Sequence, residues 1–247
     1  SDYGTCNHMT VSGTSLSQGA DLVINTAATS SLSLTKLTNS EAIVCYKDEG
    51  SSNHGTCNHL TVSGTSLIKG AEPDLVFNGA STADIAVVRL TNAKAAVAYV
   101  DKGNSDYGTC KRLDVSGTLL SASSAFVFKS ATTSDLSATA FDAYKVAVCY
   151  QDGGNSNSGT CNVMHVGNGF PFTLGADLIF SSVATTVTSV AMLATFQAAV
   201  CYYTGSDGVC RVLKRESSPN TALSLPGSEV LPYHLRYHQL EPHYAHP

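Results

Sequence analysis

A unit of about 50 residues that returns along this chain is the feature that most constrains its fold. Gly-Thr-Cys occurs at residues 4–6, 55–57, 108–110 and 159–161, and a degenerate copy, Gly-Val-Cys, follows at 208–210. The same order of polar and apolar segments surrounds each copy. A fixed period of this length indicates a repeat protein, in which each unit buries its apolar face against its neighbours.

Each unit contains four short segments with strand character. In the second unit they are residues 56–62, 74–78, 85–91 and 95–99, separated by turns rich in Gly, Ser, Asn and Asp. The fourth segment is the most apolar and its residues are mostly small, as expected for a strand buried on both faces. Helical spacing is not sustained anywhere in the repeat. Four short strands per unit are typical of a propeller blade.

The sequence therefore predicts an all-β fold, a β-propeller of about four four-stranded blades in a domain spanning residues 1–214. A fragment of a larger propeller, a β-sandwich and a β-solenoid remain alternatives. The units are expected at about 3–52, 53–106, 107–157 and 158–207, and residues 208–214 are expected to be a closing strand. The chain opens inside a repeat, so we expect Ser1 to be a processed or truncated start. The proline-rich residues 215–247 are expected to be an extended or disordered tail.

Six of the eight cysteines fall into matched pairs, which flank the loop between the fourth strand of one unit and the first strand of the next. The pairs are Cys45 with Cys57, Cys149 with Cys161, and Cys201 with Cys210. If these strands form antiparallel hairpins, the two sulfurs of each pair oppose one another within disulfide reach, with buried thiols as the alternative.

Two cysteines fall outside this scheme. Cys110 faces Ala98, and the partner of Cys6 would precede Ser1, so both are predicted to be unpaired or bonded elsewhere. Three disulfides would place the protein in an oxidising compartment, outside the cell or in the secretory lumen.

Charge and hydropathy exclude two classes of partner. The net charge of −5 and the pI near 5.8 provide no basic surface for nucleic acid or for an anionic membrane. The apolar stretch 187–203 is interrupted by polar residues and aligns with two ordinary strands of other units, so no membrane insertion is expected.

The inter-unit loops carry oxygen-rich clusters that begin at Asp48, Asp101 and Asp152. Such loops could coordinate calcium, but Asp, Asn, Ser and Gly are also the usual turn residues. We predict turns and no cofactor, with calcium left open. The carboxyl-terminal tail carries four histidines, for which an unstructured tail is favoured over a metal site. They are His234, His238, His243 and His246.

The strongest candidates for ligand contact are four tyrosines, one at the end of the fourth strand of each unit. They are Tyr46, Tyr99, Tyr150 and Tyr202. In a ring they would be displayed at equivalent points of one rim beside the Asp loops, as sugar-stacking residues often are. The alternative is that they wedge neighbouring blades together. His8 and His59 share one repeat position, which indicates partly exposed strand residues or, alternatively, a repeated ligand contact.

No catalytic motif is present in the sequence. It contains no Gly-x-Ser-x-Gly elbow, phosphate-binding glycine loop or His-Glu-x-x-His motif. We therefore predict a secreted, non-enzymatic module that binds a glycan or an extracellular protein through repeated rim sites. The alternative is a structural or assembly protein, in which edge strands and the two odd cysteines join neighbours.

Residues 44–58 and 148–162 share the pattern Val-Cys-Tyr-x-Asp-x-Gly-x-x-x-x-Gly-Thr-Cys-Asn. Over residues 1–214 this repeat resembles secreted repeat proteins of dinoflagellates and related protists. That resemblance implies no activity for particular residues. The expected architecture is also similar to compact lectin propellers, although their motif residues are not found here, so this similarity is one of shape.

Overall fold

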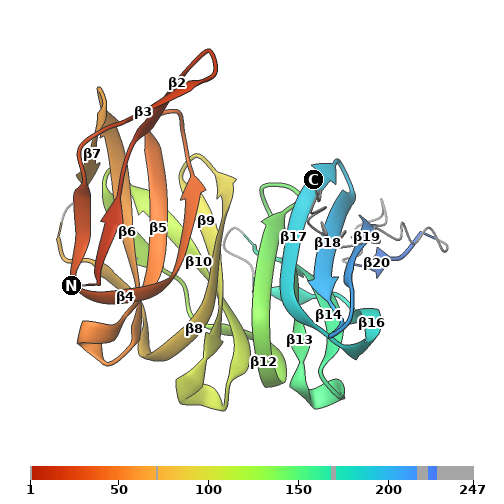
Figure 1. Ribbon diagram of the computed structural model, residues 1–247. Helices are drawn as coiled ribbons and strands as arrows, with labels where there is room; N and C mark the ends of the chain where they lie inside the picture. The colour runs from red at the N-terminus through yellow and green to blue at the C-terminus, as the bar shows by residue number, and fades with distance from the viewer. Residues whose placement is uncertain (1, 71, 168–170, 216–221, 227–247) are drawn as a thin grey trace, which may run out of the picture.

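The computed structural model describes residues 2–70, 72–167, 171–215 and 222–226, and this part of the chain is almost entirely β-structure (Figure 1). It contains no helix long and apolar enough to cross a lipid bilayer. The strands are β1 (Tyr3–Cys6), β2 (Met9–Ser12), β3 (Ser15–Gln18), β4 (Leu22–Lys36), β5 (Glu41–Asp48), β6 (His54–Ser63), β7 (Ser66–Lys69), β8 (Leu75–Thr91), β9 (Lys94–Asp101), β10 (Tyr107–Ser116), β11 (Leu119–Ala122), β12 (Phe126–Ala140), β13 (Lys145–Asp152), β14 (Ser158–His165), β15 (Thr173–Leu174), β16 (Leu178–Ala184), β17 (Thr186–Ala194), β18 (Gln197–Tyr203), β19 (Gly208–Arg215) and β20 (Leu223–Ser224).

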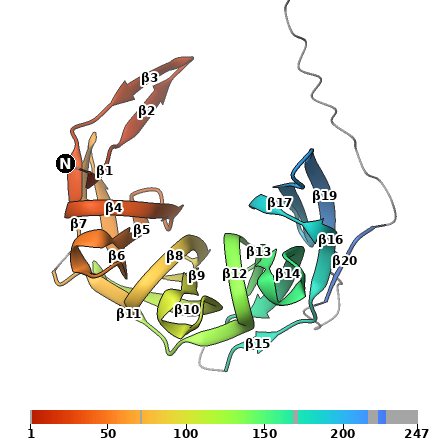
Figure 2. The ribbon, with the colours of Figure 1, turned by 60° about the horizontal axis from the view of Figure 1, so that its bottom comes forward.

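Three complete four-stranded blades form the centre of the molecule, and we call them A, B and C. Blade A consists of residues 29–36 of β4, then β5, β6 and residues 75–81 of β8. Blade B consists of residues 82–91 of β8, β9, β10 and residues 126–132 of β12. Blade C consists of residues 133–140 of β12, β13, β14 and β16. The blades stand side by side along an arc, with β8, β12 and β17 on its inner side (Figure 2).

Incomplete blades lie at both ends of the arc. A half-blade at the amino end consists of β1 and residues 22–28 of β4, and a blade D at the other end consists of β17, β18 and β19, with only the two residues of β20 beyond them. The predicted closing strand 208–214 does form a strand, β19. It pairs with β18 and β20, and among the described residues no strand of blade D pairs with β1 or β4.

The blades are offset from the sequence units, because the predicted second and third strands of a unit form one long strand. β4, β8 and β12 each begin as the outer strand of one blade and continue as the inner strand of the next. Each bends at a residue with positive φ, Ser31, Asp84 or Asp135, and Val187 has this conformation in the fourth unit. Each unit therefore contributes strands to two blades.

Neighbouring blades are also joined through their inner strands. Ser33 Oγ accepts a hydrogen bond from the backbone N–H of Val87 at 3.0 Å, and Ser137 Oγ accepts one from Val190 at 3.1 Å. The repeat position of these serines is Ala86 in blade B, which cannot make this bond.

The hydrophobic cores lie between blades. Phe77, on the outer strand of blade A, contacts Tyr99 of blade B with ring centroids 5.1 Å apart. Phe128 and Tyr150 form the same pair between blades B and C at 5.5 Å, and Phe180 and Tyr202 form it between blades C and D at 4.8 Å. Side chains of both sheets thus interdigitate at these three junctions.

The three predicted disulfides are confirmed. Cys45–Cys57, Cys149–Cys161 and Cys201–Cys210 are bonded, with Cα–Cα distances of 4.1, 4.1 and 4.0 Å. Cys6 and Cys110 are free thiols, as predicted, and Cys110 lies opposite Ala98. Burial raises the pKa of the Cys110 thiol to about 12, because the interior disfavours the thiolate.

Candidate functional site: a cleft between blades

The four predicted tyrosines are not displayed on a rim. The exposed fractions of Tyr46, Tyr99 and Tyr150 are 0–1%, and that of Tyr202 is 4%. Burial also raises the pKa of the three most buried phenols, with nearby carboxylates adding to the effect. The prediction that these rings stack on a ligand is therefore wrong, and the alternative in which they wedge neighbouring blades describes their contacts.

The aspartates of the inter-unit loops hold turns. Asp48, Asp101 and Asp152 each precede a 3₁₀ turn and accept a hydrogen bond from a glycine N–H two residues later, at 3.0–3.1 Å. Each also binds a side chain of the preceding blade at one repeat position, namely Asn25, Asn78 or Lys129.

The side chains of these loops are not arranged as a calcium site. The carboxylates are occupied by protein donors, and the described residues form no group of three or more acidic, His or Cys side chains suited to a metal ion. The four tail histidines lie outside the described residues, and so their role stays a prediction.

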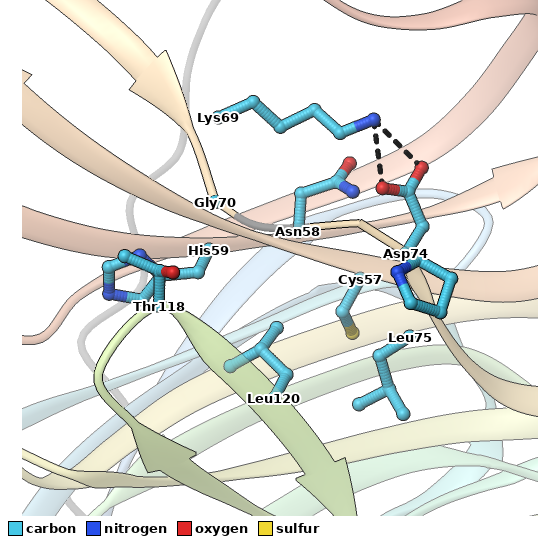
Figure 3. Close-up of a pocket in the computed structure, with 10 residues that line it drawn as sticks. Cys57, Asn58, His59, Lys69, Gly70, Asp74, Leu75, Thr118 and Leu120 are labelled. Atoms are coloured by element: carbon cyan, nitrogen blue, oxygen red, sulfur yellow. Dashed lines mark hydrogen bonds and ion pairs between the residues drawn. The ribbon is translucent and has the colours of Figure 1, made fainter.

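A cleft lies at the junction of blades A and B, where the β10–β11 hairpin of blade B meets β6 and β7 of blade A (Figure 3). Polar side chains line one part of it and two leucines another. The lining residues include Asn58, His59, Lys69, Asp74, Thr118, Leu75 and Leu120. The empty volume is about 200 Å³, and because this figure includes open solvent at the mouth, the enclosed space is much smaller. The cleft can therefore admit only a small part of a ligand.

The ring of His59 in this cleft lacks hydrogen-bond partners. Both of its nitrogens are buried, and no described residue hydrogen-bonds to them. The buried amide oxygen of Asn58 is also unpartnered in the described structure, but consecutive residues of β6 point to opposite faces of blade A. Burial lowers the pKa of His59, and this effect is only partly opposed by Glu41, whose Oε1 lies 3.7 Å from Nε2. The ring is therefore neutral at pH 7, with one nitrogen able to donate and the other able to accept.

An ion pair lies at the other end of the cleft. Lys69 Nζ lies 2.8 Å and 3.1 Å from the two carboxylate oxygens of Asp74, and 2.6 Å from Glu72. In Figure 3, Lys69 and Asp74 lie apart from the neighbouring pair His59 and Thr118. The cleft therefore offers a neutral donor and acceptor at one end and an ion pair at the other.

The junction between the half-blade and blade A repeats this constellation. His8 occupies the position of His59 in its repeat unit, and its Nδ1 is likewise buried without a hydrogen-bond partner in the described structure. Asn7 donates to Asp21, and these residues correspond to Asn58 and Asp74. The backbone agrees, since Gly19 donates to His8 O at 2.8 Å and Gly70 to His59 O at 2.7 Å.

The other two junctions differ. Between blades B and C, Arg112 occupies the histidine position and bonds Gly167 O and Asp114. Between blades C and D the position is Val163. Asn162, the equivalent of Asn58, points to the blade B side of blade C, where it accepts from Tyr150 and donates to Asp177, each at 2.6 Å. The recurrence of His8 and His59 was visible in the sequence. Their burial without partners was not, because it depends on the neighbouring blade.

Comparisons with solved structures identify the fold. No protein-family model and no curated protein matches the chain. The NanB sialidase of Streptococcus pneumoniae matches it with a TM-score of 0.54 at 14% identity, over 76% of this chain and 30% of that one. AofleA of Arthrobotrys oligospora matches with a TM-score of 0.52 at 12% identity, over 80% of this chain and 56% of that one. The fold is a β-propeller.

The propeller neighbours differ in kind and in length. The Aleuria aurantia lectin in complex with α-methyl-L-fucoside is also similar, with a TM-score of 0.48 at 12% identity over 85% of this chain and 82% of that one. This propeller chain spans about half the length of AofleA and less than a third of NanB.

Proposed function

We propose that this chain is a non-catalytic carbohydrate-binding module, and that a hydroxyl group of one sugar unit enters the cleft between blades A and B. The observation that carries the proposal is the pair of buried, unpartnered ring nitrogens of His59. Sugar hydroxyls donate and accept at once, so they suit a neutral imidazole, which offers one donor and one acceptor nitrogen. Buried polar groups without partners are costly, and a ligand that satisfies them gains that energy.

Two further observations support a sugar as the ligand. The molecule shares its fold with NanB, which is by name a sialidase, a protein that acts on sugars. Its three disulfides are typical of an oxidising compartment, where glycans are abundant partners.

The lining of the cleft favours binding over hydrolysis. Glycosidases commonly place two carboxyl groups on either side of the bond they cleave. The described lining contains one carboxylate, Asp74, and Lys69 holds it in an ion pair. A paired carboxylate orients a hydroxyl group better than it transfers a proton.

Substitution of His59 tests the site. We expect a glycan array and then calorimetry at pH 7, with and without calcium, to identify a glycan whose affinity falls at least about tenfold in His59→Val, the loss expected for a missing buried hydrogen bond. Valine is compatible with the fold here, because Val163 occupies the same repeat position in a fully buried strand.

Arg112→Val is the matched control, since it makes the same kind of change at the junction of blades B and C. It should leave the affinity within about twofold, a difference well below the energy of one hydrogen bond. Circular dichroism of each variant checks the fold. Absence of glycan binding under both conditions, or equal binding by wild type and His59→Val, would contradict the proposal.

A further inference from the structure

The outward face of blade D exposes residues at positions that blades A and C bury against the next blade. We call Ala199, Cys201, Cys210 and Val212 the carboxyl face. In blade C the corresponding residues are 0% exposed, and in blade A they are at most 2% exposed. These are Ala147, Cys149, Cys161 and Val163 in blade C, and Ile43, Cys45, Cys57 and His59 in blade A. In blade D, Val212 is 38% exposed and the Cys201–Cys210 disulfide is partly open to solvent.

The amino-terminal half-blade exposes the complementary side. We call Met9, Val11 and Leu16 the amino face, and these side chains are 51%, 69% and 66% exposed. Met9 corresponds to Leu60, Leu113, Met164 and Leu213, which are all 0–1% exposed. The positions of Val11 and Leu16 are occupied in blade B by Val115 and Leu120, which pack on the core between blades A and B.

We infer that the carboxyl face of one copy packs against the amino face of a second copy, head to tail. The argument is continuity with an interface that the molecule already makes three times, between blades A and B, B and C, and C and D. In each of these three junctions a face like that of blade D is covered by residues at the positions of Met9, Val11 or Leu16. No described residue covers either face in the single chain.

The contact is heterologous, because two different faces meet. Such contacts leave one free face at each end of a dimer, so they continue into longer assemblies or close into rings. The open arc in Figure 2 places the two faces at opposite ends of the molecule. The described residues of one chain therefore leave both faces uncovered, whereas a second copy can cover one of them.

The full chain is tested by sedimentation velocity with light scattering between about 1 and 100 μM, the range of weak specific association. We expect the average mass to rise with concentration beyond that of a dimer. Leu16→Lys and Val212→Lys should each remain monomeric, because each variant retains only one functional face. Both side chains are exposed in the single chain, so the substitutions should leave the circular dichroism spectrum unchanged.

Mixing the two variants distinguishes this contact from other associations. An equimolar mixture of Leu16→Lys and Val212→Lys should form dimers and nothing larger, because the intact amino face of the second fits the intact carboxyl face of the first. Ile68→Lys is the control, since Ile68 is an exposed apolar residue on β7 outside both faces, and it should assemble like the wild type.

Several outcomes would overturn the inference. A wild-type chain that is monomeric at every concentration excludes the contact. Assembly that survives in Leu16→Lys or Val212→Lys places the interface elsewhere, and a mixture that stays monomeric shows that the two faces do not fit one another.

Discussion

The glycine of the repeated Gly-Thr-Cys is required for a steric reason. A Cβ added to Gly55, Gly108 or Gly159 would lie 2.3–2.4 Å from a ring carbon of Phe77, Phe128 or Phe180. Each phenylalanine stands on the adjacent outer strand and reaches across the glycine to the tyrosine of the next blade. The glycine is thus the space that lets the interblade aromatic pair form.

Gly159→Ala should therefore destabilise the protein, while Gly208→Ala should not. The first forces the ring of Phe180 to move, at a cost of about 1–3 kcal/mol typical of overpacking. The second adds a methyl group where no atom lies within 4 Å. Chemical denaturation of both variants measures the difference, and equal free energies of unfolding would refute this account.

Single residues show where sequence reasoning succeeds and where it stops. The cysteine pairing was predictable, because two residues that flank one hairpin need only local geometry to meet. The burial of Tyr99, Tyr150 and Tyr202 was not, since their phenylalanine partners belong to the preceding blade. The same limit hid the burial of His59, which depends on a hairpin about 60 residues further along the chain.

At the level of strands, the repeat predicted the number and type of elements better than their continuity. The predicted second and third strands are one bent strand in β4, β8 and β12. A short strand after the first strand of each unit, such as β7 or β11, was missed because its four residues resemble a turn. The long strands transfer the chain between blades, which a pattern read one unit at a time does not show.

The β9–β10 hairpin lacks the disulfide of its counterparts, and one substitution should restore it. Ala98 and Cys110 face each other in the register that joins Cys45 to Cys57 and Cys149 to Cys161. Ala98→Cys should therefore form a disulfide with Cys110 and add about 2–3 kcal/mol to the free energy of unfolding.

Thiol titration checks this substitution, since the oxidised variant should retain the single free thiol of Cys6. Denaturation with and without reductant gives the energy. Two additional reactive thiols in the unfolded variant would show that the expected bond did not form.

In the whole molecule, the free energy of local opening should be highest in the central blades and lowest at the two ends of the arc. Blades B and C are covered on both faces, whereas the β2–β3 hairpin has no buried residue and β19 contacts a neighbour on one face only. Repeat proteins are stabilised by neighbour contacts, so their ends open first.

Amide hydrogen exchange should therefore be slowest in β9, β10, β13 and β14, and fastest in β2, β3 and β19. The difference should span at least about tenfold in rate, which corresponds to 1.4 kcal/mol. If head-to-tail assembly occurs, protection of β2, β3 and β19 should rise with protein concentration, while that of β9 and β13 stays unchanged. Uniform protection along the arc would contradict this gradient.

The bent strands and the disulfides together limit the effect of a proteolytic cut. A cut in the 3₁₀ turn at 49–51 or 153–155 lies inside a hairpin that a disulfide holds together on both sides. Because β4, β8 and β12 each belong to two blades, no such cut separates one blade from its neighbours. The disulfide keeps the two fragments joined after such a cut. Of the three 3₁₀ turns described here, only the one at 102–104 connects strands without a disulfide, because Cys110 faces Ala98.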